Sequence, residues 1–227
     1  MRIDILTLFP DMVRGVLSQS IIGRAQNSGI IEINCIDIRD FTTNKHKKVD
    51  DAPYGGGAGM VMQPEPIYLA YKSIVDNVTI TPFVIYLSPQ GKVFSQALAN
   101  DLSKKEHIIL LCGHYEGVDE RVIEEIVDME VSIGDYVLTG GEIPAMVLCD
   151  SVCRLIPGVL SSEEAFSNES HYDGLLEYPQ YTRPPEFMGR SVPEVLLSGH
   201  HKNIDKWRYE QSIIRTKQKR PDLLNEV

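Results

Sequence analysis

The sequence has few cysteines, and their spacing argues against two classes of site. Four occur among 227 residues, and no two of them form a Cys-x-x-Cys pair. A zinc ribbon or a dithiol redox motif is therefore not expected. Cys149 and Cys153 lie four residues apart on a predicted helix, where small core residues fit well. We expect these two and the other pair, Cys35 and Cys112, to be reduced thiols of a cytosolic protein.

Long apolar runs are also missing. No stretch approaches the roughly 20 apolar residues that cross a membrane. The first residues read as a strand and lack the layout of a signal peptide. With 43% hydrophobic and 24% charged residues, the composition is that of a soluble globular protein. We expect a cytoplasmic location, no membrane partner, and one large domain or one domain plus a small one.

The chain has no overall excess of positive charge, and its net charge of −10 argues weakly against nucleic acid. The distribution is uneven, however. Residues 1–48 carry a net +2, residues 49–160 a net −10, and residues 198–220 a net +5. Two basic islands flank an acidic middle, so a local phosphate-binding face stays compatible with the sequence.

Glycine runs occur, but they form neither a Walker A loop nor a G-x-G-x-x-G fingerprint. Residues 39–59 are a long irregular segment in which Lys45-His46-Lys47-Lys48 and Asp50-Asp51 precede a run that ends at Gly59. A segment of this length inside a compact domain is usually functional or disordered. The Lys-His cluster could meet phosphate, which favours a polar binding loop over a flexible surface loop.

Apolar periodicity predicts alternating strands and helices. The strands are expected at residues 2–8, 30–38, 83–87 and 107–112, and the helices at 11–28, 65–76, 94–103, 119–127 and 143–155. Such alternation is typical of an α/β protein with a mostly parallel sheet. Asp119 is placed to cap the fourth of these helices.

The stretch 131–144 is the one around which the chain is organised. An apolar strand ends at Gly134-Asp135, resumes as Tyr136-Val137-Leu138 and stops at a double glycine before the next helix. By itself this stretch is either a tight strand-to-helix connection or a ligand pocket built from main chain. Because ligands lie beyond the carboxyl ends of parallel strands, we expect the loops 88–91, 113–117 and 134–141 to meet.

The last third of the chain reads as a linker and a small tail. Residues 161–173 are polar and nearly free of core residues, and 175–185 are extended and stiffened by prolines. Asn203 is placed to cap a helix at 204–217 with a basic face, which is either a solvated exterior or a partner surface. A tail this small is expected to dock on the main domain or on a partner.

The motifs of the chain resemble those of the bacterial tRNA (guanine-N1)-methyltransferase family, TrmD. They run in family order across nearly the whole chain, from the first strand through Phe9-Pro10 to the segments 49–57, 86–91, 112–121, 132–142, 156–160, 181–184 and 198–200. The resemblance implies an S-adenosylmethionine-dependent methylation of guanine N1 at position 37 of tRNA, next to the anticodon, a modification that supports reading-frame maintenance.

The same resemblance implies an architecture. Residues 1–160 would be a catalytic α/β domain of the SPOUT type with a deep trefoil knot between about residues 85 and 142. Residues 161–173 would be a flexible linker, and residues 174–227 a helical domain that binds tRNA. The family forms a homodimer whose active site is shared between subunits. It also uses Mg²⁺ for methyl transfer, although the sequence offers no dedicated carboxylate cage.

The family pattern also implies roles for individual residues. The cofactor would lie against Tyr86, Leu87, Ser88, Gly113, Ile133, Gly134, Asp135, Tyr136, Val137, Leu138, Gly140, Gly141 and Pro144. The substrate would meet Arg24, His46, Asp50, Gly59, Tyr115 and Glu116. Arg154 would stabilise negative charge on guanine O6. For Arg24 and Arg154, a cation at a helix C-terminus is a purely structural interpretation.

The catalytic base marks a departure from the family. The family has aspartate in an Asp-Ser pair, whereas this chain has Glu169 in Asn168-Glu169-Ser170. Glutamate keeps the carboxylate but adds one methylene, and a misplacement near 1 Å can cost about 100-fold in rate. Asp173 is the alternative candidate for the catalytic base. Two other hypotheses stay open: a non-catalytic or impaired relative that binds RNA and cofactor, and a knotted methyltransferase that acts on ribosomal RNA.

Overall fold

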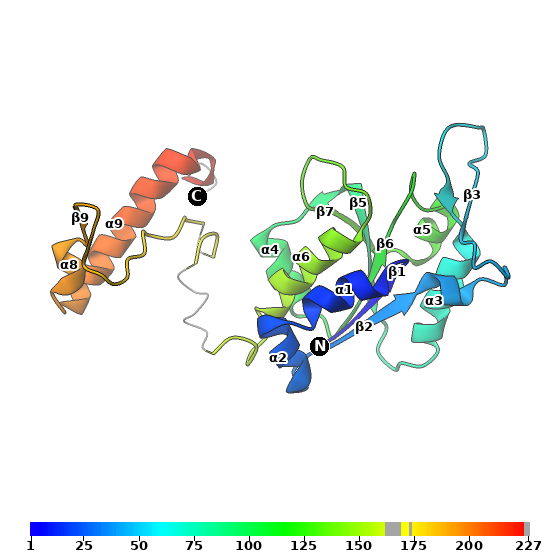
Figure 1. Ribbon diagram of the computed structural model, residues 1–227, viewed down its shortest axis with the longest axis horizontal. Helices are drawn as coiled ribbons and strands as arrows, with labels where there is room; N and C mark the ends of the chain where they lie inside the picture. Colours follow the sequence, from blue (N-terminus) through cyan, green and yellow to red (C-terminus); the bar gives the residue numbers. More distant parts are fainter. Residues whose placement is uncertain (162–168, 173, 225–227) are drawn as a thin grey trace. The chain divides into compact units, whose positions relative to one another are not determined.

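The computed structural model describes residues 1–161, 169–172 and 174–224. The chain divides into two compact units, Met1–Leu160 (unit 1) and Ser161–Val227 (unit 2), which are drawn together in Figure 1. The linker prediction, 161–173, falls largely on residues outside the described set. Among the residues that the structure describes, no helix has both the length and the apolar character needed to span a bilayer.

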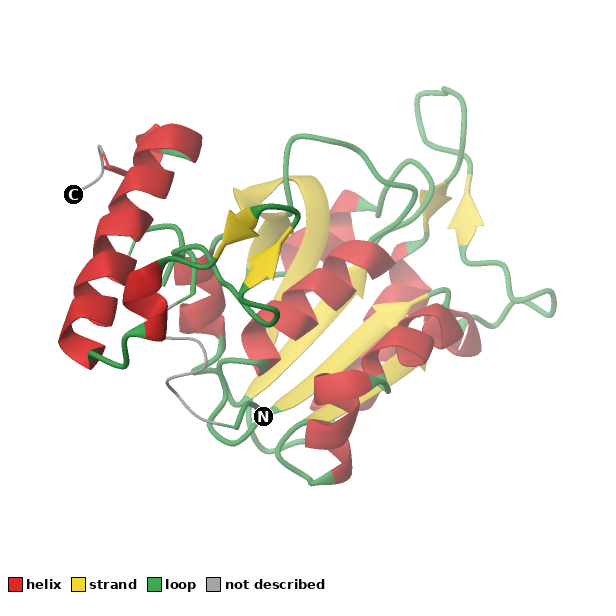
Figure 2. Cartoon of the chain, turned by 60° about the vertical axis from the view of Figure 1, so that its left-hand side comes forward, coloured by secondary structure: helices red, strands yellow, loops and turns green. Residues whose placement is uncertain are grey.

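Unit 1 is built on a five-stranded sheet in the order β2-β1-β6-β5-β7, and every neighbouring pair is parallel. Figure 2 shows these strands between layers of helices. The strands are β1 Arg2–Thr7, β2 Glu32–Asp37, β5 Phe83–Val93, β6 His107–Cys112 and β7 Met129–Ser132. The parallel α/β prediction is confirmed. The trefoil knot stays a prediction of the resemblance.

The helices cover both faces of this sheet because successive strand side chains point in opposite directions. In β6, Ile108 and Leu110 pack into one core cluster, and Ile109 and Leu111 pack into the other. The first cluster lies under α1 Pro10–Leu17, α2 Ser20–Asn27, α4 Gln96–Leu102 and α6 Glu142–Cys153. The second lies under α3 Pro64–Val75 and α5 Glu120–Ile126. A strand buried on both faces reads as a continuous apolar run, as the sequence of β6 does.

The single helix predicted at 11–28 is wrong, because the structure has two helices, α1 and α2. The chain turns between them at Ser20, whose φ is +52°. At this turn the carbonyl oxygen of Ser18 lies 2.1 Å from where a Cβ on Gly23 would stand. Only glycine permits so close an approach of backbone to backbone. The apolar spacing continues through the break, which is why periodicity alone did not reveal it.

Two further expectations around the sheet ends are corrected. Residues 88–91, predicted as a loop after β5, lie within that strand, where the pairing with β7 shifts register between Leu87 and Lys92. Residues 136–138, predicted as a resumed strand, form no strand and are exposed. β7 ends at Ser132, and residues 136–138 line a pocket.

The segment 39–59 is more ordered than expected. It begins in the 3-10 helix η1 Ile38–Phe41 and contains β3 Asp50–Asp51, which pairs antiparallel with β4 Val61–Met62. Val49 is fully buried and ties the segment to the core. The predicted cap of α5 is confirmed, since the side chain of Asp119 accepts a hydrogen bond from the Arg121 N–H at 3.0 Å.

The described part of unit 2 contains the hairpin β8 Glu186–Phe187 with β9 Arg190–Ser191, the helices α8 Glu194–Leu197 and α9 His201–Lys219, and the 3-10 helix η2 Pro221–Leu224. The cap prediction at Asn203 is wrong, because α9 already begins at His201 and Asn203 lies inside its first turn. The extended segment 175–185 is fixed to α9 where the Leu176 N–H donates to Thr216 Oγ1 at 2.9 Å.

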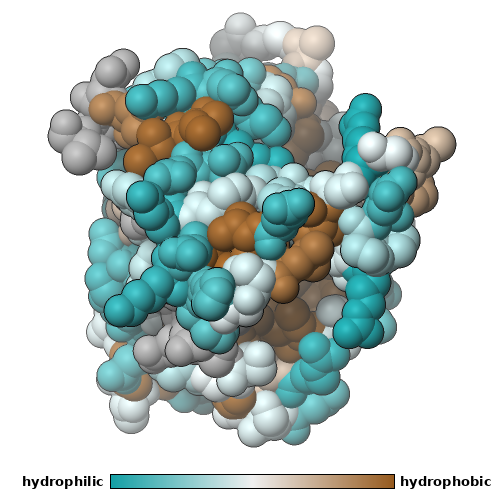
Figure 3. Space-filling model, turned by 90° about the vertical axis from the view of Figure 1, so that its left-hand side faces the viewer, coloured by the Kyte–Doolittle hydropathy of each residue, from teal (hydrophilic) through white to brown (hydrophobic). Residues whose placement is uncertain are grey.

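Unit 2 leaves large apolar side chains in contact with solvent. Phe187 is 68% exposed, Met188 86% and Leu197 63%. The face drawn in Figure 3 correspondingly has apolar patches among hydrophilic side chains. The expectation that this tail docks on another surface stays a prediction.

Candidate active site

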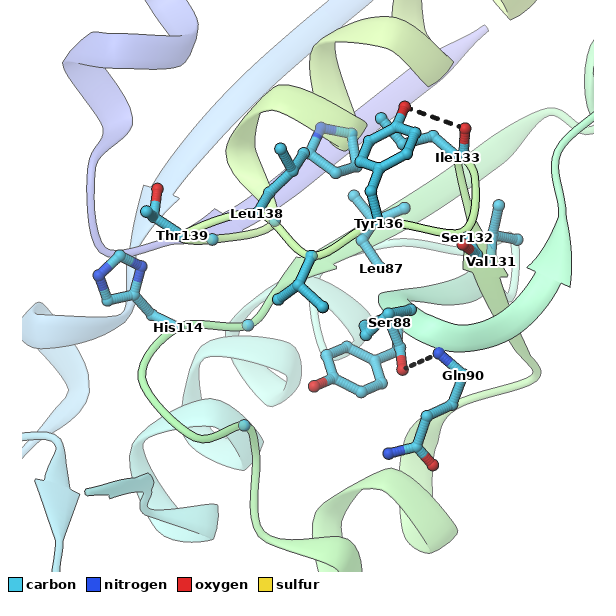
Figure 4. A pocket seen from close by; sticks show the side chains of 18 of the residues that line it. Leu87, Ser88, Gln90, His114, Val131, Ser132, Ile133, Tyr136, Leu138 and Thr139 are labelled. Carbon is cyan, nitrogen blue, oxygen red and sulfur yellow. Dashed lines mark hydrogen bonds between the residues drawn. The ribbon is translucent and has the colours of Figure 1, made fainter. Parts of the chain in front are cut away.

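A pocket of about 250 Å³ opens at the carboxyl ends of β5 and β6, beside the start of α6. Residues of the three predicted loops line it, as expected for the ligand edge of a parallel sheet: 88–90, which lie within β5, 113–117, and Gly134 with 136–141. Figure 4 shows Tyr136 and Leu138 on one side of this space and Ser88 and Gln90 on the other, with His114 and Thr139 at one end. The three loops are therefore parts of one site.

Two of the pocket glycines are needed for close approach of these loops. A Cβ on Gly141 would lie 2.7 Å from Cys112 Cα, and a Cβ on Gly113 would lie 2.9 Å from the ring of Tyr86. The Gly141 N–H donates to the carbonyl oxygen of Gly113 at 2.9 Å. The loop after β6 is thus attached directly to the start of α6. Larger residues at these positions would separate the two walls.

The start of α6 is held by a buried carboxylate. Glu142 is 3% exposed, and its Oε1 accepts a hydrogen bond from the Thr7 hydroxyl at 2.7 Å. A negative charge is favourable in the first turn of a helix, where the backbone N–H groups lack partners. This contact ties α6 to the end of β1 and fixes the loop 134–141 that precedes the helix.

The pocket walls combine apolar side chains with main-chain polar groups. The Ser88 hydroxyl accepts a hydrogen bond from the Gln90 N–H at 3.2 Å, and the Tyr136 hydroxyl donates to the Ile133 carbonyl at 3.2 Å. Burial raises the pKa of Tyr86, so its phenol stays protonated at neutral pH. Asp135 is the one cofactor candidate that does not line the pocket. The candidates that line it are Tyr86, Leu87, Ser88, Gly113, Ile133, Gly134, Tyr136, Val137, Leu138, Gly140, Gly141 and Pro144.

Sequence reasoning assigned no role to several lining residues, among them Gln90, His114 and Thr139. His114 packs between the rings of Phe9 and Tyr115, with ring centroids 5.1 and 4.9 Å away. Its Nδ1 is buried and has no hydrogen-bond partner among the described residues. The signal available in the sequence was its place directly after the glycine that ends β6.

Three of the substrate candidates lie together at the rim of the pocket. Tyr115 and Glu116 belong to the loop after β6, and both are exposed. The Glu116 N–H donates to the Met60 carbonyl at 3.0 Å, and the Glu116 side chain covers Gly59 so closely that a Cβ there would lie 2.3 Å from Oε1. Residues 59–60 thus reach the pocket through Glu116.

The other three substrate candidates do not line the pocket. Arg24 is an exposed cation in the last turn of α2, in agreement with the structural interpretation. His46 is exposed in a turn, and Asp50 is half-buried in β3. The lysines beside His46 are partly neutralised, since Lys47 pairs with Asp40 at 2.6 Å and Lys48 with Asp51 at 3.3 Å.

Neither catalytic candidate is among the residues that line the pocket of unit 1. Arg154 is the C-cap residue of α6, ten residues beyond Pro144 at the pocket wall. At a rise of 1.5 Å per residue the two are separated by about 15 Å along the helix. Glu169 belongs to unit 2, where it lines a second cavity of about 220 Å³. Asp173 lies outside the described residues.

Among residues 1–161, 169–172 and 174–224, no group of three or more His, Cys, Asp or Glu side chains is arranged to hold a metal ion. The expectation of Mg²⁺ therefore has no site to which it can be assigned.

The sequence of this chain is similar to a family model and to proteins of named activity. The family model described as tRNA (Guanine-1)-methyltransferase TrmD matches residues 1–226. The chain belongs to this family. Relatives named tRNA (guanine-N(1)-)-methyltransferase include those of Ruminiclostridium cellulolyticum, 63% identical over 100% of this chain and 97% of the relative, and Clostridioides difficile, 61% identical over 98% and 97%. That of Staphylococcus carnosus is 58% identical over 99% and 91%. The TrmD match spans both units, so neither is an unrelated addition.

Proposed function

We propose that this TrmD-family chain transfers a methyl group from S-adenosylmethionine to N1 of the guanine at position 37 of tRNA, next to the anticodon. Relatives named tRNA (guanine-N(1)-)-methyltransferase match this chain over nearly their whole length. The observation that carries the proposal is the meeting of residues 88–90, 113–117 and 136–141 in one pocket in a chain of this family. A tRNA substrate also implies that the reaction takes place in the cytoplasm.

The lining of the pocket fits the donor in chemistry. Its mixture of apolar walls and main-chain groups suits adenine and ribose. When bound, the donor supplies a methyl group on a sulfonium. Leu87, Leu138 and Pro144 would pack against the flat base, while backbone groups of the loop 134–141 would bind its polar edge.

The rim residues Tyr115, Glu116 and Gly59 are proposed to receive the target base. Guanine N1 is covered by stacking inside an RNA loop, so the base has to leave the stack before N1 can react. The exposed ring of Tyr115 offers a surface on which an extruded base can stack. Glu116 is placed beside it to accept hydrogen bonds from the base edge.

Two charged side chains would carry the proton chemistry. Neutral guanine N1 is a poor nucleophile because its lone pair is delocalised toward the neighbouring carbonyl and its in-plane electron pair forms the N–H bond. The carboxylate of Glu169 would accept that proton as the general base. The electron pair left on N1 would form the new N–C bond, while the bond from the methyl group to the donor's sulfur breaks and its electron pair stays on the sulfur, giving a neutral thioether that leaves. The negative charge that develops on O6 would be stabilised by the guanidinium of Arg154.

The position of Arg154 supports a composite site in a homodimer. Within one chain it stands about 15 Å along α6 from Pro144, too far for its side chain to reach a base at the pocket. A second copy could bring its own Arg154 to the first copy's pocket, as in a closed twofold dimer. We therefore propose that each active site takes the pocket from one subunit and Arg154 from the other.

The test is a methyl-transfer assay with labelled S-adenosylmethionine and a tRNA that carries guanine at the target position. Wild-type protein should label this tRNA and not a matched tRNA with adenine there. Glu169→Gln should lower the rate by about 100-fold or more, because the amide cannot accept the proton. Asp173→Asn is the matched control and should retain activity. No incorporation at high protein concentration would reject the proposal.

One observation favours a second candidate, a relative that binds RNA and donor but methylates poorly, since glutamate stands where the family has aspartate. Glu169→Asp separates the two. A large gain in rate with aspartate alone would favour an impaired native site. A rate equal to or below that of the wild type would favour glutamate as a fully working base.

A further inference from the structure

The cavity in unit 2 gathers charges that the mechanism above does not explain. Its lining includes the carboxylates of Glu169, Glu177 and Asp205 and the guanidinium of Arg208. Among the described lining residues, Arg208 is the only basic one. A single cation therefore stands among three acids, one of which is the proposed general base.

The guanidinium of Arg208 has an aromatic and an acidic neighbour, and its Nε–H donor is without an acceptor among the described residues. Its guanidinium lies over the ring of Tyr178, 4.9 Å from the centroid, and its Nη1 lies 3.7 Å from Asp205 Oδ1. Its Nε is buried and has no hydrogen-bond acceptor among the described residues. A buried N–H without an acceptor is unfavourable, so this donor calls for an acceptor such as a water molecule, an anion or a carboxylate side chain.

Glu169 is the carboxylate of this cavity on which the proposed chemistry depends, and Glu177 and Asp205 have contacts of their own. Glu177 Oε1 accepts a hydrogen bond from Gln180 Nε2, and Asp205 is the ion-pair partner of Arg208 on the same helix. We propose that Arg208 is a positioning residue for the methyl transfer and that its Nε–H binds the carboxylate of Glu169 when the substrate is in place. This inference rests on the proposed role of Glu169 as the base.

A contact between Arg208 and Glu169 would fix the position of the Glu169 carboxylate, whose side chain is longer than the family's aspartate. Glutamate has one more rotatable bond than aspartate, so its carboxylate has more positions to sample, and a misplacement of about 1 Å can lower a rate about 100-fold. Arginine is suited to restrict it, because the guanidinium is planar and its donors have fixed directions. Its charge would also keep Glu169 ionised and ready to accept a proton.

The experiment compares Arg208→Met and Arg208→Lys with Lys206→Met in the full-length protein, using the methylation assay with tRNA. Lys206 is the matched control, since it lies on the same helix, is 77% exposed and has only a loose contact with Glu210 at 3.9 Å. Arg208→Met should lower kcat roughly 10- to 100-fold with little change in the KM for tRNA. Lys206→Met should affect only KM, and in a salt-dependent way.

The pH profile provides a readout that a merely structural role would not move. The groups that face Glu169 in the cavity are Glu177 and Tyr178 from the extended segment and Asp205, Arg208 and Tyr209 from α9. Loss of the one cation should move the acid limb of kcat to higher pH in Arg208→Met. Arg208→Lys keeps the charge without the Nε–H, so it should restore the pH profile but not the full kcat.

A double mutant completes the test. In a Glu169→Gln background, Arg208→Met should cause little further loss, because the residue it positions no longer acts. The inference is overturned if both Arg208 variants raise KM with kcat unchanged, as a simple RNA contact would, or if the losses add fully. If Arg208→Met does not fold, Arg208→Lys alone decides between these outcomes. Wild-type activity in Glu169→Gln would instead refute the proposed base, whatever Arg208 does.

Discussion

The sharpest prediction concerns a mixture of two variants that are each inactive. Arg154→Ala removes the proposed O6-stabilising cation, and Leu138→Trp fills the pocket from its wall. Arg154 stands about 15 Å along α6 from Pro144 at the pocket, so the two substitutions disturb separate places in one chain. Arg154→Ala should therefore bind S-adenosylmethionine normally in calorimetry, whereas Leu138→Trp should not bind it.

The fraction of wild-type activity that mixing restores follows from how the parts of each active site are shared between the two subunits. In a mixed dimer, one site combines the filled pocket with the missing arginine and is dead. The other combines the intact pocket of the Arg154→Ala chain with the arginine of the Leu138→Trp chain and is complete. Random mixing gives half mixed dimers with one working site in two, so about 25% of wild-type activity should return.

The assay is tRNA methylation after the two variants are unfolded together, mixed in equal amounts and refolded. Separately refolded samples combined afterwards serve as the control and should stay inactive until subunits exchange. Sedimentation should report the dimer in every sample. If the mixture stays as inactive as its components while mixed dimers are present, each site uses its own chain's Arg154, and the argument from helix length is wrong.

Two predictions concern stability. Burial raises the pKa of the Cys153 thiol from its ordinary 9.0 to about 12. The thiol of the unfolded chain therefore releases its proton at a lower pH than the thiol of the folded chain. The free energy of unfolding should be at its full value below about pH 9 and fall as the pH rises toward 12. Urea unfolding of Cys153→Ala across this range should show a shallower fall, and an unchanged slope would contradict the assignment. Asp4 is fully buried at the far ends of the strands, where it binds His107 Nε2 at 2.6 Å and Asn34 at 2.9 Å. Asp4→Ala should lower the free energy of unfolding by about 3–5 kcal/mol, since it leaves polar groups buried without a partner, and a loss under about 1 kcal/mol in urea titration would refute this account.

Local sequence determined the elements whose causes are local. β6 was placed at 107–112 because its residues are apolar without interruption, which is typical of a strand covered on both faces. Asp119 was recognised as a cap because its carboxylate binds an N–H only two residues away. The meeting of residues 88–90, 113–117 and 136–141 followed from a general rule, that ligands bind at the edge where parallel strands end, although 88–90 lie within β5 itself.

Expectations failed where the deciding contact leaves no trace in the apolar pattern. The break between α1 and α2 depends on the approach of the Ser18 carbonyl to Gly23, which does not interrupt the apolar period. The start of α9 at His201 and the lack of a strand at 136–138 also differ from what the local pattern predicted. His114 escaped notice because its buried ring nitrogen becomes apparent only once Phe9 and Tyr115 are placed around it.

The amino-acid sequence by itself determined the parallel α/β class, the edge at which a ligand would bind and the motifs of a methyltransferase family. These follow from side-chain type and spacing along the chain. Only the tertiary structure showed that Arg154 stands a helix length away from the pocket and that Arg208 shares a cavity with Glu169. Distances between residues far apart in sequence are set by packing, and packing is a property of the folded chain.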